Sequence, residues 1–148
     1  MDHSIQAAQL FLDGYNCAQA VAVAFSDVTG IPPQQSARIA SSFGGGMGRL
    51  REVCGAVSGM FMVLGTLYGY GTPDDGMVKK DHYHRVQELA EKFRAQAGSI
   101  VCREILKNPP SDPNPTPRTQ EFYQARPCTR MVIIAAQLLD EYIANHPL

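Results

Sequence analysis

The sequence has no excess of charge of either sign and no block of like charges. Its 148 residues include 13 Lys and Arg and 14 Asp and Glu, which gives a formal net charge of −1. A protein that binds nucleic acid normally carries a basic surface, and a polybasic membrane-binding segment needs clustered Lys and Arg. Because neither is present, the sequence predicts no nucleic-acid partner and no membrane partner.

The sequence also lacks a secretory signal and a typical membrane span. Residues 1–14 have no apolar run of the length that a signal peptide needs and no basic start, so a signal peptide is not expected. The longest charge-free run, Val53–Pro73, is just long enough to cross a bilayer. However, it contains several glycines and two tyrosines, and no second segment resembles it. We therefore expect a cytoplasmic protein with a single domain, residues 1–148, which is long enough to bury a core.

Common cysteine motifs are absent as well. The four cysteines are separated by tens of residues: Cys17, Cys54, Cys102 and Cys128. This spacing excludes a thioredoxin-type C-x-x-C motif, the C-x-x-C-H of haem attachment and zinc-finger knuckles. In a cytoplasmic protein, four cysteines are more typical of redox or metal chemistry than of permanent disulfides.

What the sequence does contain is a series of helix patterns separated by Gly and Pro. Hydrophobic periodicity predicts helices over residues 4–13, 17–29, 33–43, 77–97, 100–107 and 127–145. In the first of these we expect Ile5, Ala8 and Leu12 to lie on one face. The run over residues 53–70 is expected to be a buried central helix, and the proline-rich residues 108–119 an extended loop. The predicted fold is all-α, a bundle of about six helices around the central one.

Each cysteine follows a signal for the start of a helix. The signals that precede the four cysteines are, in chain order, Asn16, a glycine-rich turn, Ser99 and Pro127. In the first turn of a helix, the unpaired N–H groups and the helix dipole stabilise a thiolate relative to a thiol. The thiolate is the form that attacks disulfides and binds metals. If the helices bring these ends together, two thiols suit reversible disulfide chemistry, and four suit Zn²⁺ or a [2Fe–2S] cluster.

The glycine-rich turn before Cys54 is a second candidate site. Gly44, Gly45 and Gly46, together with Arg49, are candidates for a backbone nest that binds an anion or the phosphate of a cofactor. The turn has no Lys-Ser/Thr and no preceding strand, so nucleotide binding is not expected. A simpler interpretation is a tight turn that lets the central helix enter the core. Arg49, and Arg51 two residues on, are also close enough in sequence to Cys54 to lower its pKa.

The histidines form no clear metal motif. His82 and His84 are two residues apart, so they do not share a face of a helix. We expect His82 to lie at an interface in the core and His84 on the surface. His3 and His146 lie near the ends of the sequence and suggest no function.

The order of these features resembles one known family. A Cys-Gly-Ala-Val-Ser-Gly block runs from Cys54 to Gly59 after a glycine-rich turn. Cys17 precedes this block in the sequence, and Cys102 and Cys128 follow it. The chain resembles the bacterial and archaeal family of redox-active proteins defined by a CGAxxG motif and four cysteines, C_GCAxxG_C_C. The resemblance covers nearly the whole chain and implies redox activity at the cysteines. Related cysteine modules occur in some bacterial cytochromes alongside iron–sulfur chemistry. The resemblance therefore leaves an iron–sulfur cluster as one alternative for this chain.

Together these features favour a redox-active protein whose chemistry runs through Cys54, with Cys17, Cys102 and Cys128 as further catalytic or metal-binding residues. Thiol–disulfide exchange and a cysteine-bound [2Fe–2S] cluster both remain open, as does an oxidoreductase activity. One alternative is a Zn or Cu module without redox turnover. Another is a structural or partner-binding helical domain in which the cysteines only pack. The electron or thiol partner is unidentified, and the glycine-rich helix faces leave a homodimer open.

Overall fold

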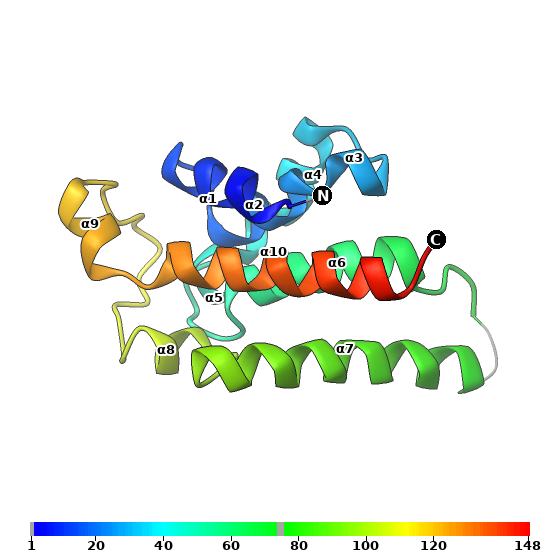
Figure 1. Ribbon diagram of the computed structural model, residues 1–148. Coiled ribbons are helices and arrows are strands. Elements are labelled where there is room, and N and C mark those ends of the chain that lie inside the picture. The colour runs from blue at the N-terminus through cyan, green and yellow to red at the C-terminus, as the bar shows by residue number, and fades with distance from the viewer. Residues whose placement is uncertain (1, 74–75) are drawn as a thin grey trace.

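The computed structural model describes residues 2–73 and 76–148, which form an all-α fold (Figure 1). The helical segments are α1 (Ser4–Leu12), α2 (Cys17–Ala24), α3 (Ser26–Thr29), α4 (Pro33–Ala40), the 3₁₀ turn η1 (Ser41–Phe43), α5 (Gly44–Met47), α6 (Gly55–Tyr68), α7 (Gly76–Ala97), α8 (Cys102–Ile105), α9 (Gln120–Ala125) and α10 (Cys128–Asn145). These are more than the six or so expected, because several segments contain only about one turn. No β-strand forms in the described ranges; Val53 and Val101 make an isolated antiparallel bridge.

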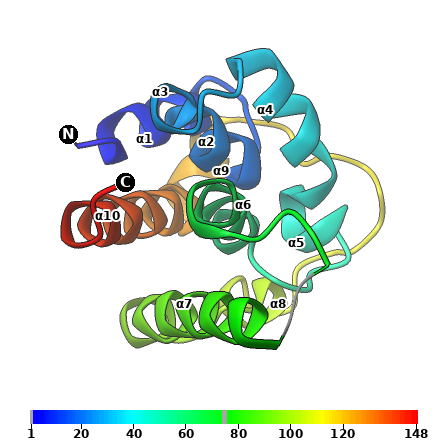
Figure 2. The same ribbon diagram turned by 90° about the vertical axis from the view of Figure 1, so that its right-hand side faces the viewer.

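Helix α6 is the buried helix expected over residues 53–70. In the end-on view it lies near the middle of the molecule, with α10 to one side, α2 above it and α7 below it (Figure 2). Val57, Met60 and Leu64 are fully buried along its length. The core therefore forms where α6 meets the two helices α2 and α10, with α7 closing the remaining side.

Two glycines let α2 and α6 come into close contact. A Cβ atom at Gly59 would lie 2.7 Å from the carbonyl oxygen of Ala18, and a Cβ atom at Gly55 would lie 3.1 Å from the Cβ atom of Cys17. Real Cβ atoms do not tolerate the first of these distances. The absence of side chains at both positions therefore places Cys17 beside the start of α6, next to Cys54.

The predicted buried face of α1 is wrong. Ile5 and Leu12 are 73% and 46% exposed, whereas Ala7 and Phe11 are buried. The two faces both have helical spacing, so the periodicity alone does not distinguish them. Phe11 decides the orientation because its larger ring packs against Phe122, from a region far along the chain.

The proline-rich residues 108–119 form the expected extended loop, and this loop is tied to the rest of the chain by arginines. The Nε atom of Arg49 donates to the carbonyl oxygen of Asp112 at 2.7 Å, and the Nε atom of Arg51 donates to that of Pro110 at 2.9 Å. Helix α9, which the sequence did not predict, follows the loop. The Thr119 side chain caps it by accepting a hydrogen bond from the backbone of Phe122.

None of the helices in the described part of the chain is long and apolar enough to cross a bilayer. The charge-free residues 53–73 form α6 and the turn after it, and α6 ends at Tyr68.

Candidate functional site

The four cysteines line one cavity, of about 320 Å³. Cys17, Cys102 and Cys128 are the first residues of α2, α8 and α10, and Cys54 is the residue directly before α6. The structure thus places every cysteine at the start of a helix, as the sequence predicted, and brings residues from four separate segments to one place.

A short backbone pairing brings Cys54 and Cys102 together. The backbone N–H of Cys54 donates to the carbonyl oxygen of Ile100 at 2.8 Å, and the N–H of Cys102 donates to that of Glu52 at 2.6 Å. Val53 and the residue before Cys102 form the isolated bridge between these bonds. Because this pairing is made by backbone groups, no side-chain pattern in the sequence predicted it.

The cap of α2 fixes Cys17. The side chain of Asn16 accepts a hydrogen bond from the backbone N–H of Gln19 at 2.9 Å, and the side chain of Gln19 accepts one from the backbone N–H of Asn16 at 3.0 Å. This reciprocal arrangement is a capping box, which satisfies two backbone donors at the helix start. The predicted cap at Asn16 is therefore confirmed, and it holds Cys17 in the first turn.

The glycine-rich turn forms a wall of the same cavity. Gly44, Gly45, Gly46 and Arg49 all line it. A Cβ atom at Gly46 would lie 2.6 Å from the Cβ atom of Cys102, and the φ angle of Gly46 is +71°. The backbone N–H groups of residues 48, 49, 51 and 52 donate to carbonyl oxygens within the turn. These four groups are therefore not free to bind an anion, and the turn acts first as a closely packed wall.

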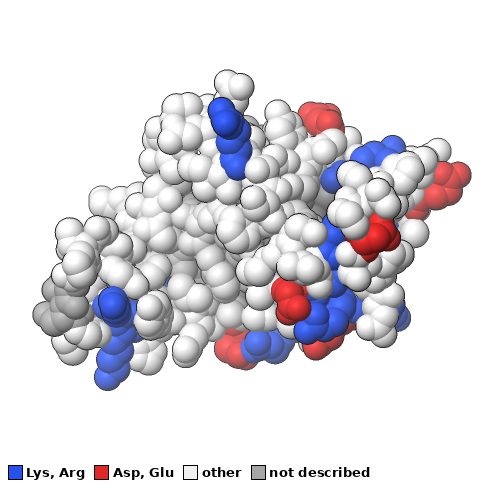
Figure 3. Space-filling view, turned by 180° about the vertical axis from the view of Figure 1, so that it is seen from behind, with Lys and Arg blue, Asp and Glu red and all other residues white. Residues whose placement is uncertain are grey.

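Arginines supply the charge of the cavity. Arg49, Arg51, Arg118 and Arg126 are among its lining residues, and no Asp or Glu of the described chain is. Seen from behind, Lys and Arg gather together with Asp and Glu toward the end of the molecule that carries α8 and α9, while the rest of this face has few charges (Figure 3).

Two of these arginines come from the last third of the chain and were not singled out from the sequence. The guanidinium of Arg118 donates to the carbonyl oxygens of Phe11 and Tyr15, both at 3.1 Å, and it lies 4.6 Å from the ring centre of Phe11. Arg126 lies 5.1 Å from the ring centre of Phe122. The position of Arg126, two residues before a cysteine, was the one signal in the sequence that could have indicated its role.

Cys17 and Cys128 form the most polarised pair in the cavity. Their side chains share a hydrogen bond, and this bond is the largest cause that lowers the pKa of Cys128, to about 7. Burial, the second largest cause, acts in the opposite direction, and the positive charges of Arg126, Arg118 and Arg51 act together with the hydrogen bond to lower the pKa of Cys128. The same hydrogen bond is the largest cause that raises the pKa of Cys17 well above that of a free thiol. These opposite directions favour the thiolate form at Cys128 and the thiol form at Cys17.

The other two cysteines are less prone to ionise. Burial raises the pKa of Cys54 to about 12, although the nearby backbone N–H groups of Val57 and Ala56 act in the opposite direction. Burial also raises the pKa of Cys102, and the hydrogen bond from the Nη1 atom of Arg51, at 3.7 Å, offsets it only in part. Arg51 therefore acts on Cys102; its closeness in sequence to Cys54 had suggested either a lowered pKa of Cys54 or a solvated side chain.

The Cys17–Cys128 pair also differs from Cys54 and Cys102 in solvent exposure. Cys54 and Cys102 are each 6% exposed, whereas Cys17 and Cys128 are both partly exposed. No group of three or more His, Cys, Asp or Glu side chains is arranged to hold a metal ion in residues 2–73 and 76–148.

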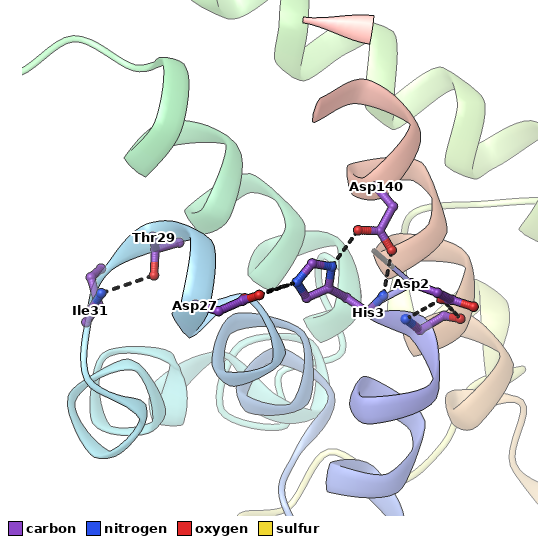
Figure 4. Close-up of polar contacts among 7 residues, drawn as sticks. Asp2, His3, Asp27, Thr29, Ile31 and Asp140 are labelled. Atoms are coloured by element: carbon purple, nitrogen blue, oxygen red, sulfur yellow. Dashed lines mark hydrogen bonds and ion pairs between the residues drawn. The ribbon is translucent and has the colours of Figure 1, made fainter. Parts of the chain in front are cut away.

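A second buried ionisable cluster lies outside the cavity, at His3. Its Nδ1 atom is 2.6 Å from a carboxylate oxygen of Asp140, and its Nε2 atom is 3.0 Å from both carboxylate oxygens of Asp27 (Figure 4). The ring also stacks on Phe25, with centroids 4.1 Å apart. Burial by itself would lower the pKa of His3, but the hydrogen bonds to Asp140 and Asp27, together with the negative charges of these two carboxylates, outweigh burial and raise it. This cluster was not predicted from the sequence, in which His3, Asp27 and Asp140 lie far apart.

Comparison with known proteins adds one finding to this geometry. A family model described as "Putative redox-active protein (C_GCAxxG_C_C)" matches residues 15–142. The matched region includes all four cysteines and every arginine of the cavity. No curated protein and no solved structure matches the chain.

Proposed function

Because this chain belongs to the C_GCAxxG_C_C family, we propose that it is a thiol–disulfide oxidoreductase in which Cys128 attacks and Cys17 resolves. The observation that carries this proposal is the hydrogen-bonded Cys17–Cys128 pair, in which the pKa of Cys128 falls to about 7. A thiol of that pKa is about half ionised at neutral pH, close to the optimum for an attacking thiol. Both residues are also partly exposed in the cavity.

The exchange proceeds in two steps. The thiolate of Cys128 attacks one sulfur of an external disulfide, forms a mixed disulfide and releases the other half as a thiolate. Cys17 then loses its proton to that leaving thiolate or to water, and its sulfur attacks the sulfur of Cys128. This step releases the second half of the substrate and leaves a Cys17–Cys128 disulfide. Two electrons pass from the protein to the substrate, and a thiol reductant reverses the sequence.

The pair is arranged so that the second step follows the first. The hydrogen bond to Cys128 is the largest cause of the raised pKa of Cys17. When Cys128 enters a mixed disulfide, it has no negative charge for Cys17 to stabilise, and this cause is removed. The Cys17 thiol then ionises more easily, at the stage where it has to act as the nucleophile.

In this proposal Cys54 is not the nucleophile that the sequence analysis had placed at the centre of the chemistry. Its pKa of about 12 keeps it a thiol at neutral pH. The pKa of Cys102 is also raised, which favours the thiol form there as well. Both are buried beside the reactive pair and pack as part of the cavity wall, as free cysteines commonly do.

A cysteine-bound [2Fe–2S] cluster or a Zn or Cu ion is the second candidate, and the shared cavity of the four cysteines is the observation in its favour. The donor arrangement of the described residues does not fit such a group, since no three of the candidate ligands converge. We therefore route no step through a metal. Anaerobic purification followed by an absorption spectrum and metal analysis distinguishes the two candidates, and iron with sulfide bound in stoichiometric amount would overturn the dithiol proposal.

The direct test oxidises the reduced protein with bis(hydroxyethyl) disulfide and maps disulfides by mass spectrometry. We expect a Cys17–Cys128 disulfide that thiol reductants remove. The Cys128→Ser variant should abolish the reaction, and Cys17→Ser should accumulate a mixed disulfide on Cys128, because the resolving step is missing.

Cys54→Ser and Cys102→Ser serve as matched controls that change the same cavity without changing the proposed pair. Both should still form the Cys17–Cys128 disulfide. Loss of the reaction in Cys54→Ser with full retention in Cys128→Ser would return the chemistry to Cys54. Thiols that remain unreactive in the native protein would leave only a packing role for the cysteines.

A further inference from the structure

The cavity contains more positive charge than the protein neutralises. It is lined by Arg49, Arg51, Arg118 and Arg126 and by no carboxylate of the described chain. Of these four, Arg49 alone has a carboxylate within ion-pair distance among the described residues, with 4.0 Å between its Nη2 atom and an oxygen of Asp112. Burial and the neighbouring charge of Arg51 lower the pKa of Arg49, which reflects the same crowding of positive charge.

Arg51 has an unsatisfied donor at this place. Its side chain is buried and the residue is only 3% exposed. The Nε atom donates to the carbonyl oxygen of Pro110, and the Nη1 atom donates to the sulfur of Cys102. The Nη2 atom, however, has no partner among the described residues. Buried guanidinium donors are almost always hydrogen-bonded, because leaving one without a partner is costly. The vacant donor therefore indicates an acceptor that comes from outside the chain.

We propose that the cavity binds the carboxylate of a small disulfide substrate, held by the Nη2 atom of Arg51 with Arg118 and Arg126 beside it. This inference rests on the proposed function and names the substrate class of the same site. The planar guanidinium presents donors in a geometry that matches a carboxylate. A carboxylate supplies both the missing acceptor and the missing negative charge.

The dimensions and walls of the cavity favour a small molecule. A volume of about 320 Å³ is at the lower end of the range of small-molecule sites. Phe122, Pro113 and Pro115 form part of the wall and offer apolar surface to a short carbon chain. The sulfur atoms of a carboxylate-bearing disulfide would then face Cys128, which also lines the cavity. The reaction consumes this disulfide and releases two carboxylate-bearing thiols, with the two electrons supplied by Cys17 and Cys128.

The test compares three disulfides of similar size and different charge: anionic dithiodipropionate, neutral bis(hydroxyethyl) disulfide and cationic cystamine. The measured quantity is the second-order rate constant for oxidation of the Cys17–Cys128 pair. We expect dithiodipropionate to react about tenfold to a hundredfold faster than the neutral disulfide, as a charge-assisted hydrogen bond allows. Cystamine should react more slowly than the neutral disulfide.

The Arg51→Gln variant should bring the anionic-to-neutral rate ratio close to one. The ratio is the useful quantity, because any change in the ionisation of Cys128 affects both rates alike. Arg130→Gln is the matched control, since this exposed arginine lies on α10 near Cys128, outside the cavity, and donates to the carbonyl oxygen of Gln96. It should keep the wild-type ratio. If Arg51→Gln fails to fold, Arg126→Gln takes its place and should lower the ratio.

The outcomes separate the two proposals. Reaction with the neutral disulfide but no preference for the anionic one would overturn the carboxylate site and leave the proposed function standing. No reaction with any of the three would overturn the proposed function. A second arm does not depend on the redox chemistry: succinate should raise the melting temperature of the wild-type protein and not that of Arg51→Gln. An equal rise in both would also overturn the site.

Discussion

The cavity and the His3 cluster both bury ionisable groups, but they balance charge in opposite ways. At His3, one imidazole lies between the carboxylates of Asp27 and Asp140, and both ring nitrogens have partners. In the cavity, by contrast, a buried donor of Arg51 has no partner within the described chain. A satisfied polar cluster rigidifies a fold, whereas an unsatisfied one lowers stability unless a ligand completes it. The satisfied contacts of His3 are those of a structural cluster, whereas the unpartnered donor of Arg51 is the feature on which we base the proposed ligand site in the cavity.

The largest expected effect is on the cavity wall. Gly46→Ala would place a Cβ atom 2.6 Å from the Cβ atom of Cys102, at a φ angle of +71°. Overpacking and backbone strain together should lower the free energy of unfolding by roughly 3 kcal/mol or more. Urea denaturation measures the loss. Gly98→Ala is the matched control, with a φ angle of +90° but nothing within 4 Å, and should cost about 1 kcal/mol. Equal losses would mean that the cavity wall is not closely packed.

The next effect tests the structural role of the His3 cluster. His3→Ala removes the hydrogen bonds to both carboxylates and the stacking on Phe25. We expect the free energy of unfolding to fall by about 2 kcal/mol, while the rate of Cys128 alkylation stays unchanged. The exposed His84, changed to Ala, is the control and should alter stability by less than about 0.5 kcal/mol. A slower alkylation of Cys128 in His3→Ala would show that the His3 cluster and the cavity do not act independently.

The pH dependence of the same variant sharpens this comparison. The pKa of His3 in the folded protein is raised above its ordinary value of 6.5 by the hydrogen bonds to Asp140 and Asp27 and the negative charges of these two carboxylates, which together outweigh burial. The folded state then binds the proton more tightly than the unfolded state does. The stabilisation is complete below about pH 6.5 and is lost as the pH rises through the raised pKa. The stability difference between wild type and His3→Ala should therefore shrink with increasing pH, as urea denaturation across the neutral range can measure. A difference that grows with pH would contradict the assignment.

Local signals in the sequence predicted the features that depend on a few neighbouring residues. Asn16 caps α2 as expected, and α10 runs from Cys128 to Asn145 within one residue of the expected start. The helix starts of the cysteines and the buried helix α6 follow from the same kind of signal. Contacts between distant segments could not be predicted from these local signals. One example is the packing of Phe11 on Phe122, which determines the face of α1 that is buried.

The proposed choice of Cys128 as the nucleophile depends on contacts of this distant kind. Cys54 follows a prominent glycine-rich motif, but its depth in the core raises its pKa. Cys128 has no conspicuous motif, yet it meets Cys17 from the other end of the chain and lies near Arg118 and Arg126. Helix-start signals in the sequence singled out the four cysteines, and the structure places all four at one cavity. These signals could not rank them, because desolvation and charge are set by tertiary packing.

The smallest expected effect concerns the electrostatics of Cys128. In the wild-type protein the pH profile of Cys128 alkylation by iodoacetamide should have its midpoint at about pH 7. Arg126→Gln removes the arginine that lowers this pKa most, so the midpoint should move upward. The shift is small because the hydrogen bond from Cys17 and the charge of Arg118 remain. Arg130→Gln, which removes a charge outside the cavity, should leave the midpoint in place. Equal shifts in both variants would show that the net charge of the protein, and not the arrangement of the cavity, activates Cys128.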